Sequence, residues 1–197
     1  MGLDYLGLNP DQFPEFRKKF HGELLICGSG RCAWDDLQKI NWTNYDVMCV
    51  NDMIMHFPGK VTHVYSNDHH MLPNWVAARR PQYKKEESII VHTCHVGSST
   101  MKIWPFPGHG SSSLSACYVG LALGYDSITL AGIPLDDSGH YFDPPWVKTN
   151  FLCEVPERIL NEKPYPRYWE SAARNVFDGK VRSLSGRTKE LLDDFSA

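Results

Sequence analysis

The chain has 197 residues, of which 42% are hydrophobic and 22% are charged, and its formal net charge is -3. This length suits one domain with a sizeable core, and we expect residues 1–197 to form a single α/β domain. The charge balance, without a basic run, gives no reason to expect binding to nucleic acid. No apolar run approaches the roughly 20 residues that cross a bilayer, so we expect no membrane span.

Six cysteines are present, and none forms a C-x-x-C pair. Cys27, Cys49 and Cys117 lie inside apolar runs, where cysteine behaves as a small buried hydrophobe. The N-terminus lacks the charged-then-apolar order of a secretory signal. We therefore expect reduced thiols and a cytoplasmic protein.

Apolar runs and turn residues predict strands and helices in alternation. Strands are expected over 23–27, 46–51, 61–65, 88–92, 127–131 and 180–184. Helices are expected over 12–20, 31–40, 71–80, 113–124, 168–177 and 188–195. Strands that alternate with helices require crossover connections. The pattern therefore predicts a Rossmann-like three-layer α/β sandwich with a mainly parallel sheet.

The segment 134–166, after the fifth predicted strand, is long for a loop in a compact domain. Such loops are usually functional lids or disordered. This one carries the aromatic residues Tyr141, Phe142, Trp146, Phe151 and Tyr165. Their presence favours an ordered lid. The rings suit stacking on a base or sugar, or packing within the lid, and the sequence leaves both readings open.

Polar residues follow each predicted strand. In open parallel sheets, ligands bind beyond the carboxyl ends of the strands. The residues at these places include Gly28-Ser29-Gly30, Asn51-Asp52, the run 67–70, Asp136, Asp137, His140 and Ser183. We therefore predict a phosphate or nucleotide pocket at this edge of the sheet.

The Gly28-Ser29-Gly30 turn has a direct rationale as one wall of this pocket. Glycines let the backbone turn tightly and approach a ligand. The helix that follows would present free N–H groups and its positive end to an anion. An ordinary turn from strand to helix has the same spacing, so the motif alone leaves both readings open.

Ser111, Ser112 and Ser113 precede a helix that is apolar almost all round. One serine suffices to cap a helix N-terminus. The additional hydroxyl and amide groups are suited to holding a phosphate or a carboxylate. A well-capped core helix is the other interpretation.

Candidate catalytic groups lie in the predicted lid. His140 suits the role of a general base, because the reference pKa of histidine lies near neutral, and Asp137 is a second candidate. A solvated loop histidine is the alternative interpretation. Asp68 and Asp136 are carboxylates that could position magnesium through water.

Four segments together resemble the sialyltransferase-like nucleotide-binding superfamily. They are 25–31, 46–51, 59–68 and, as the closest match, the block 111–133. The block is similar to one in bacterial lipooligosaccharide sialyltransferases, in archaeal-type 6-hydroxymethylpterin pyrophosphokinases and in related flagellin-modifying glycosyltransferases. The family pattern departs at Arg31 and Cys32, which stand in place of Pro and Ser, and at Pro134, which stands in place of Asp.

The resemblance implies a nucleotide pocket. In the sialyltransferases the first turn and the Asn after the second strand contact a cytidine nucleotide, and lid tyrosines hold its phosphate. Carried over, the resemblance implies nucleotide contacts at Ser29, Gly30, Asn51, Ser112 and Tyr141. Together with the polar residues at the sheet edge, the predicted nucleotide-binding residues are Gly28, Ser29, Gly30, Asn51, Asp68, Ser111, Ser112, Ser113 and Tyr141. His140 would correspond to the base, although those enzymes place theirs further into the lid.

Three hypotheses about function stay open. The first is a sialyltransferase-like glycosyltransferase that uses a nucleotide-activated sugar and no cofactor, with an unknown acceptor. The second is a pyrophosphokinase-like enzyme in which Asp68 and Asp136 position magnesium. The third is a nonenzymatic nucleotide-binding protein. A homo-oligomer is compatible with each hypothesis.

Overall fold

The computed structural model describes residues 20–79, 88–94, 101–105, 111–144 and 165–195. The predicted helix over 12–20 falls almost wholly outside these ranges. The second half of the predicted lid, with Trp146 and Phe151, lies outside them as well.

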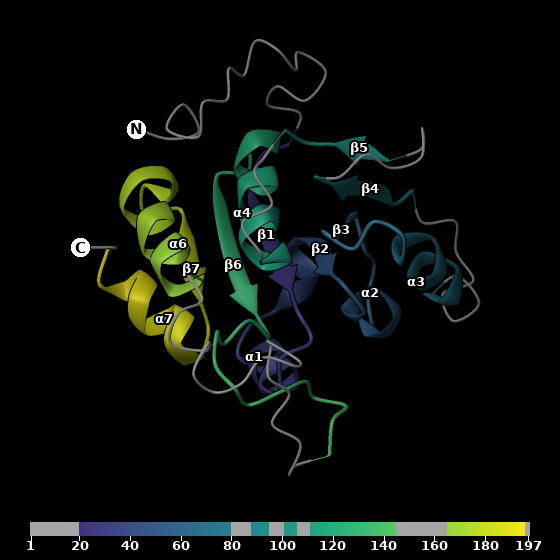
Figure 1. Ribbon diagram of the computed structural model, residues 1–197, viewed down its shortest axis with the longest axis horizontal. Coiled ribbons are helices and arrows are strands. Elements are labelled where there is room, and N and C mark those ends of the chain that lie inside the picture. Colours follow the sequence, from purple (N-terminus) through teal and green to yellow (C-terminus); the bar gives the residue numbers. More distant parts are fainter. Residues whose placement is uncertain (1–19, 80–87, 95–100, 106–110, 145–164, 196–197) are drawn as a thin grey trace.

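The described residues form one seven-stranded sheet in the order β5-β4-β3-β2-β1-β6-β7 (Figure 1). Every strand pairing in it is parallel. The strands are β1 (Glu23–Cys27), β2 (Asp46–Val50), β3 (His63–Tyr65), β4 (Ile90–Thr93), β5 (Lys102–Ile103), β6 (Ser127–Ala131) and β7 (Val181–Ser183). The predicted parallel sheet is confirmed. The two-residue strand β5 was not predicted.

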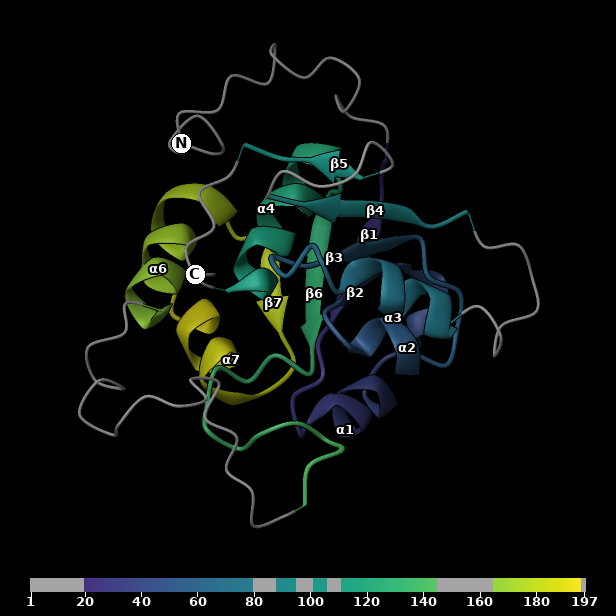
Figure 2. The ribbon, with the colours of Figure 1, turned by 45° about the vertical axis from the view of Figure 1, so that its right-hand side comes forward.

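Helices cover both faces of the sheet (Figure 2), which confirms the three-layer sandwich. One face packs against α1 (Ala33–Gln38), α2 (Met53–His56) and α3 (Leu72–Arg79). The other packs against α4 (Ser112–Leu123), α6 (Tyr165–Ala172), the π-helical turn η5 (Ala173–Phe177) and α7 (Gly186–Asp193). A short 3-10 helix, η4 (Trp42–Asn44), precedes β2. The single-turn helix α2 was not predicted.

Strand β1 lies inside the sheet, between β2 and β6. Its residues Leu24, Leu25, Ile26 and Cys27 are all fully buried. Leu24 and Ile26 pack toward α4, and Leu25 and Cys27 pack toward α1. A strand covered on both faces reads as a continuous apolar run, which is why the sequence predicts it correctly.

Helix α4 crosses β1, β2 and β6 and is buried along most of its length. Ser111 caps its N-terminus by accepting a hydrogen bond from the amide of Leu114, and Gly124 ends it in a left-handed conformation. A β-carbon at Gly120 would lie 2.7 Å from Leu24 Cδ2 and 2.9 Å from Ile128 Cδ1. The absence of a side chain there lets α4 approach the sheet closely.

Five cysteines fall within the described ranges, and all five are free thiols, as predicted. Over the same ranges, no helix has the length and apolar character needed to cross a membrane.

Candidate functional site

The strand order changes direction at β1, because β2 follows it on one side while β6 pairs with its other side. Such a switch point is where open parallel sheets bind ligands, beyond the carboxyl ends of the strands. The segments that leave the sheet there are Gly28–Gly30 after β1 and Gly132–Pro134 after β6. These two turns therefore border the expected binding position.

The chain itself fills the space directly beside the first turn. The amide of Gly28 donates to Ala131 O and that of Gly30 to Gly132 O, each at 2.9 Å. The amide of Arg31 donates to Gly139 O at 2.9 Å. These three amides therefore bond within the protein, and anion binding by the helix that follows stays a prediction. A nucleotide contact through other atoms of this turn stays a prediction.

Close packing explains the glycines of this turn. A β-carbon at Gly28 would lie 2.8 Å from Gly132 O, and one at Gly30 would lie 2.5 Å from Pro134 Cδ. Gly132 is in the left-handed region, with φ +66°, and its β-carbon would lie 2.2 Å from Gly28 O. The glycines at both positions of the Gly-x-Gly motif thus allow the two turns to pack closely against each other.

Polar side chains gather one strand further along, after β2 and β3. Asn51, directly after β2, has a left-handed backbone with φ 54°. The buried hydroxyl of Ser66 donates to Asn51 Oδ1 at 2.7 Å and accepts from the amide of Asp68 at 2.9 Å. The predicted residues Asn51 and Asp68 are therefore held together through Ser66.

The N-terminus of α4 joins this cluster. The amide of Asn67 donates to Ser112 Oγ at 3.1 Å. Asn67 Oδ1 accepts from Tyr65 Oη at 2.9 Å and from the thiol of Cys94 at 3.2 Å. Ser113, like its two serine neighbours, is buried. The structure thus places the predicted serines beside the end of β3.

The hydrogen bonds of this cluster use its acceptor atoms. The amide oxygens of Asn51 and Asn67 accept from protein donors, and no acceptor among the described residues takes their carboxamide N–H groups. Ser112 Oγ accepts from a backbone amide, and no acceptor within the same ranges takes its O–H hydrogen. We call these three side chains the donor cluster. Groups of this kind complement phosphate and carbonyl oxygens.

Ser29 connects the first turn to the residue that follows Asn51. Its buried hydroxyl donates to Asp52 Oδ1 at 2.7 Å, and its carbonyl accepts from the amide of Tyr141 at 3.0 Å. The ring of Tyr141 packs edge-on against Trp34 and His56, with centroids 5.1 Å and 5.7 Å away. Burial, followed by the negative charge of Asp52, raises the pKa of Tyr141. The hydroxyl is therefore protonated at neutral pH.

His140 is paired with a carboxylate. Its Nδ1 lies 3.1 Å from Asp143 Oδ2, and its backbone amide donates to the same oxygen at 2.8 Å. The imidazole stacks on the ring of Phe142, with centroids 5.0 Å apart. A bond from Nδ1–H to a carboxylate leaves the lone pair on Nε2, the form that a general base needs. Asp137 is exposed on the same segment.

The two carboxylates proposed for magnesium follow strands that are not neighbours. Asp68 follows β3 and Asp136 follows β6, which lie three positions apart in the sheet order. That separation is about 14 Å at the usual spacing of strands. Asp136 Oδ1 accepts from the amide of Ser138 at 2.9 Å. Within the described ranges, no group of three or more His, Cys, Asp or Glu side chains is placed to hold a metal. The metal site stays a prediction.

Two residues of this edge, Ser66 and Asp143, were not predicted in any role, whereas Asp52 and Asn67 were expected at the edge but were not assigned to nucleotide binding. Ser66 directly follows β3, and this position is a signal that the sequence contains. Asp143 lies three residues after His140, a spacing with no general meaning outside a helix. Its pairing with His140 emerges only from the local turn.

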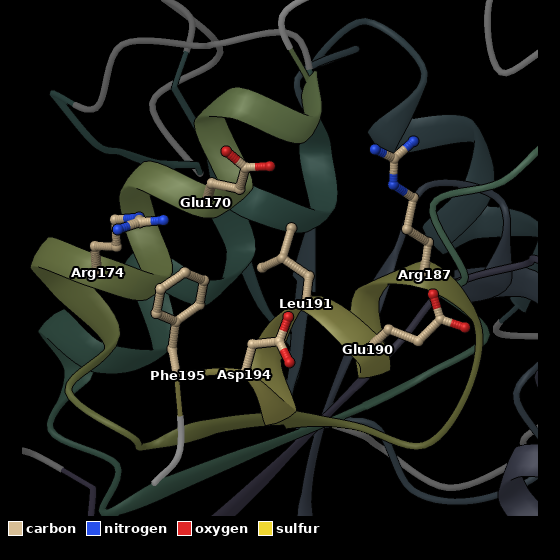
Figure 3. Close-up of a pocket in the computed structure, with 7 residues that line it drawn as sticks. All are labelled: Glu170, Arg174, Arg187, Glu190, Leu191, Asp194 and Phe195. Atoms are coloured by element: carbon tan, nitrogen blue, oxygen red, sulfur yellow. The ribbon is translucent and has the colours of Figure 1, made fainter.

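A separate hollow of about 300 Å³ lies between α6 and α7 (Figure 3). Its lining contains none of the predicted site residues. It is formed by Glu170, Arg174, Arg187, Glu190, Leu191, Asp194 and Phe195. Both carboxylates and guanidinium groups line it, and Arg174 lies over the ring of Phe195 at 4.6 Å.

The fold is shared with sialyltransferases. Sialyltransferase CstII from Campylobacter jejuni, in complex with the substrate analogue cytidine-5′-monophosphate, aligns with a TM-score of 0.50 and 15% identity over 83% of this chain and 79% of that one. A tyrosine-to-phenylalanine variant of Cst-II in complex with CMP aligns with a TM-score of 0.50 and 16% identity over 83% and 81%. The expected resemblance is confirmed at the level of fold. No family model and no curated protein matches the sequence.

Proposed function

We propose that this chain is a sialyltransferase-like glycosyltransferase that uses a nucleotide-activated sugar, with a cytidine nucleotide as the leaving group. The observation that carries the proposal is the donor cluster of Asn51, Asn67 and Ser112 beyond β2 and β3. Its acceptor atoms are occupied by the protein, and its donor hydrogens match the oxygens of a phosphate. The fold shared with CMP-bound sialyltransferases supports the same class of ligand.

In the proposed reaction, the donor cluster and the pair of His140 and Asp143 have separate roles. The donor cluster binds the phosphate that leaves as the bond between sugar and phosphate breaks. Stabilisation of that developing charge is usually the largest catalytic contribution. His140, oriented by Asp143, accepts the proton of the acceptor hydroxyl as its oxygen bonds to the sugar. Asp137 is the second candidate for this base.

The first experiment is a thermal-shift panel with CMP, AMP, GMP, UMP and ATP at millimolar concentration, with EDTA or with magnesium. We expect CMP to raise the Tm in EDTA, since a ligand at 100 times its Kd stabilises a protein by about 2.7 kcal/mol. A response to ATP that requires magnesium would instead support the pyrophosphokinase-like hypothesis. The absence of any shift would remove both enzyme hypotheses.

The second experiment changes one atom of the donor cluster. Asn51→Asp retains an oxygen that accepts from Ser66 and tolerates the left-handed backbone. It replaces the N–H donors with negative charge, so it should abolish the CMP shift. The control is Asn44→Asp, the same change at an exposed residue before β2, at the opposite edge of the sheet. Equal CMP shifts in the two variants would exclude Asn51 from the site.

A further inference from the structure

Ser29 links a carboxylate to the backbone of Tyr141 at one corner of the site, and the charge of that carboxylate, Asp52, reaches the Tyr141 hydroxyl and contributes to its raised pKa. Ser29 bonds to Asp52 through its hydroxyl at 2.7 Å and to the amide of Tyr141 through its carbonyl at 3.0 Å. Asp52 is partly exposed and follows Asn51 after the end of β2. The corner therefore contains residues from three segments: the turn after β1, the end of β2 and the segment after β6.

Each of the two groups has unused bonding capacity. Asp52 accepts from Ser29 through Oδ1, and no other donor among the described residues bonds to this carboxylate. The hydroxyl of Tyr141 is buried and has no hydrogen-bond partner within the described ranges. One group thus needs a donor and the other an acceptor. A sugar hydroxyl meets both needs, because it donates one hydrogen bond and accepts others.

This corner differs from the donor cluster in its charge, and therefore in the part of a ligand that it can bind. A carboxylate repels phosphate, so the acidic corner suits a neutral part of the ligand. In dinucleotide-binding folds with the same β1–β2 arrangement, an acidic residue after the second strand binds a ribose hydroxyl. Asp52 occupies that position, 24 residues after Gly28 (52 − 28).

We propose that Asp52 and Tyr141 bind the ribose 2′-hydroxyl of the nucleotide, with Asp52 as the acceptor and Tyr141 as the donor. This assignment rests on the proposed function and specifies which part of the nucleotide meets the acidic corner. It makes the protein selective for ribonucleotides over 2′-deoxyribonucleotides. Ser29 acts as a positioning residue that holds the carboxylate in place.

The test compares the four ribonucleoside 5′-monophosphates with their 2′-deoxy counterparts by thermal shift and by calorimetry. We expect the ribonucleotide that binds best to lose about tenfold or more in affinity when its 2′-hydroxyl is removed, as for a hydrogen bond to a charged group. Asp52→Asn and Tyr141→Phe should each reduce this ratio toward one. Asp35→Asn, which removes an exposed carboxylate from α1, should leave it unchanged.

The outcomes separate the two proposals. A nucleotide that binds equally well in both sugar forms would overturn the ribose assignment and leave the proposed function intact. A ribose preference that survives in Asp52→Asn and Tyr141→Phe would overturn it as well. If no nucleotide of either series binds, the proposed function fails and this assignment fails with it. The wild-type comparison requires no variant, so poor folding of one variant does not weaken the test.

Discussion

Nδ1 of His63 lies 3.0 Å from Nε2 of His92, and both imidazoles are fully buried. Trp104 Nε1 donates to Nδ1 of His92 at 3.0 Å, and because an indole only donates, the proton of neutral His92 is on Nε2. His63 therefore accepts at Nδ1 and donates from Nε2 to Tyr125 Oη at 2.9 Å. Tyr125 donates in turn to Asp46 at 2.9 Å. Each of these hydrogen bonds is donated in the same direction, from Trp104 toward Asp46, and this arrangement requires both histidines to be neutral.

This chain of bonds predicts a loss of stability at mildly acidic pH. Burial lowers the pKa of His63 to about 4, although the charge of Asp46 acts in the opposite direction. Burial, then His63, also lowers the pKa of His92. Unfolded histidines titrate near 6.5 and bind protons first as the pH falls, so the free energy of unfolding decreases. For His63 alone, the decrease between pH 7 and pH 5 is about 2 kcal/mol.

Urea unfolding at pH 7, 6 and 5 measures this decrease, in a range where most carboxylates stay ionised. His63→Gln should flatten the dependence on pH. His70→Gln, which removes an exposed histidine, should not. A free energy of unfolding that stays constant from pH 7 to pH 5 would show that the buried histidines do not have these pKa values.

The sheet was predictable because its central strands are buried on both faces. Leu24–Cys27 and Val47–Val50 are almost fully buried and read as continuous apolar runs. Strand β5 has only two residues, both exposed, and no local pattern marks it. The position of polar residues after strands singled out Asn51 and Asp68, which the structure joins through Ser66, and their role in binding stays a prediction.

Contacts between distant segments were not predictable from local sequence. The glycines of the first turn looked like a site for an anion, yet their amides donate to the segment after β6. The donors and acceptors of His63, His92 and Tyr125 come from segments up to 79 residues apart. From a single sequence one can predict which strand or loop contains such a residue, but not which distant residue it bonds to.

Gly132 and Gly179 allow the cost of close packing to be measured separately from the cost of a left-handed backbone. Both have positive φ, +66° and +70°, but only Gly132 meets other atoms at the β-carbon position. Gly179→Ala should lower the free energy of unfolding by about 1–2 kcal/mol, the cost of the backbone conformation. Gly132→Ala should cost at least about 2 kcal/mol more, because its β-carbon overlaps Gly28 O. Equal costs in urea unfolding would contradict the close approach of the two turns.

Asp36, on helix α1, connects the segments that follow β6 and β7. Its fully buried carboxylate accepts from the amide of Gly132 at 3.0 Å, from Ser185 Oγ at 2.7 Å and from Lys39 Nζ at 2.8 Å. Asp36→Ala leaves the buried amide of Gly132 without its acceptor, whereas Ser185 Oγ still bonds to Cys32 Sγ and Lys39 Nζ to Leu184 O. The expected cost is about 1–3 kcal/mol.

The matched control for Asp36 is its exposed neighbour on the same helix, Asp35. Asp35→Ala should change the free energy of unfolding by no more than about 0.5 kcal/mol. Both variants are compared with the wild type by urea unfolding at pH 7. Similar values for the two would mean that the bonds to Gly132 and Ser185 do not contribute to stability.

Substitution of Tyr125 and of Tyr141 by phenylalanine should have different effects on the free energy of unfolding. The hydroxyl of Tyr125 bonds to His63 and Asp46, so Tyr125→Phe should lower the free energy of unfolding by about 1–3 kcal/mol. The buried hydroxyl of Tyr141 has no partner among the described residues, so Tyr141→Phe should leave the ligand-free protein as stable as the wild type, or more stable by about 1 kcal/mol. Urea unfolding without and with saturating ribonucleotide measures both effects. A hydroxyl reserved for a ligand contributes only in the second condition, and a loss of stability without nucleotide would show that Tyr141 has a structural partner instead.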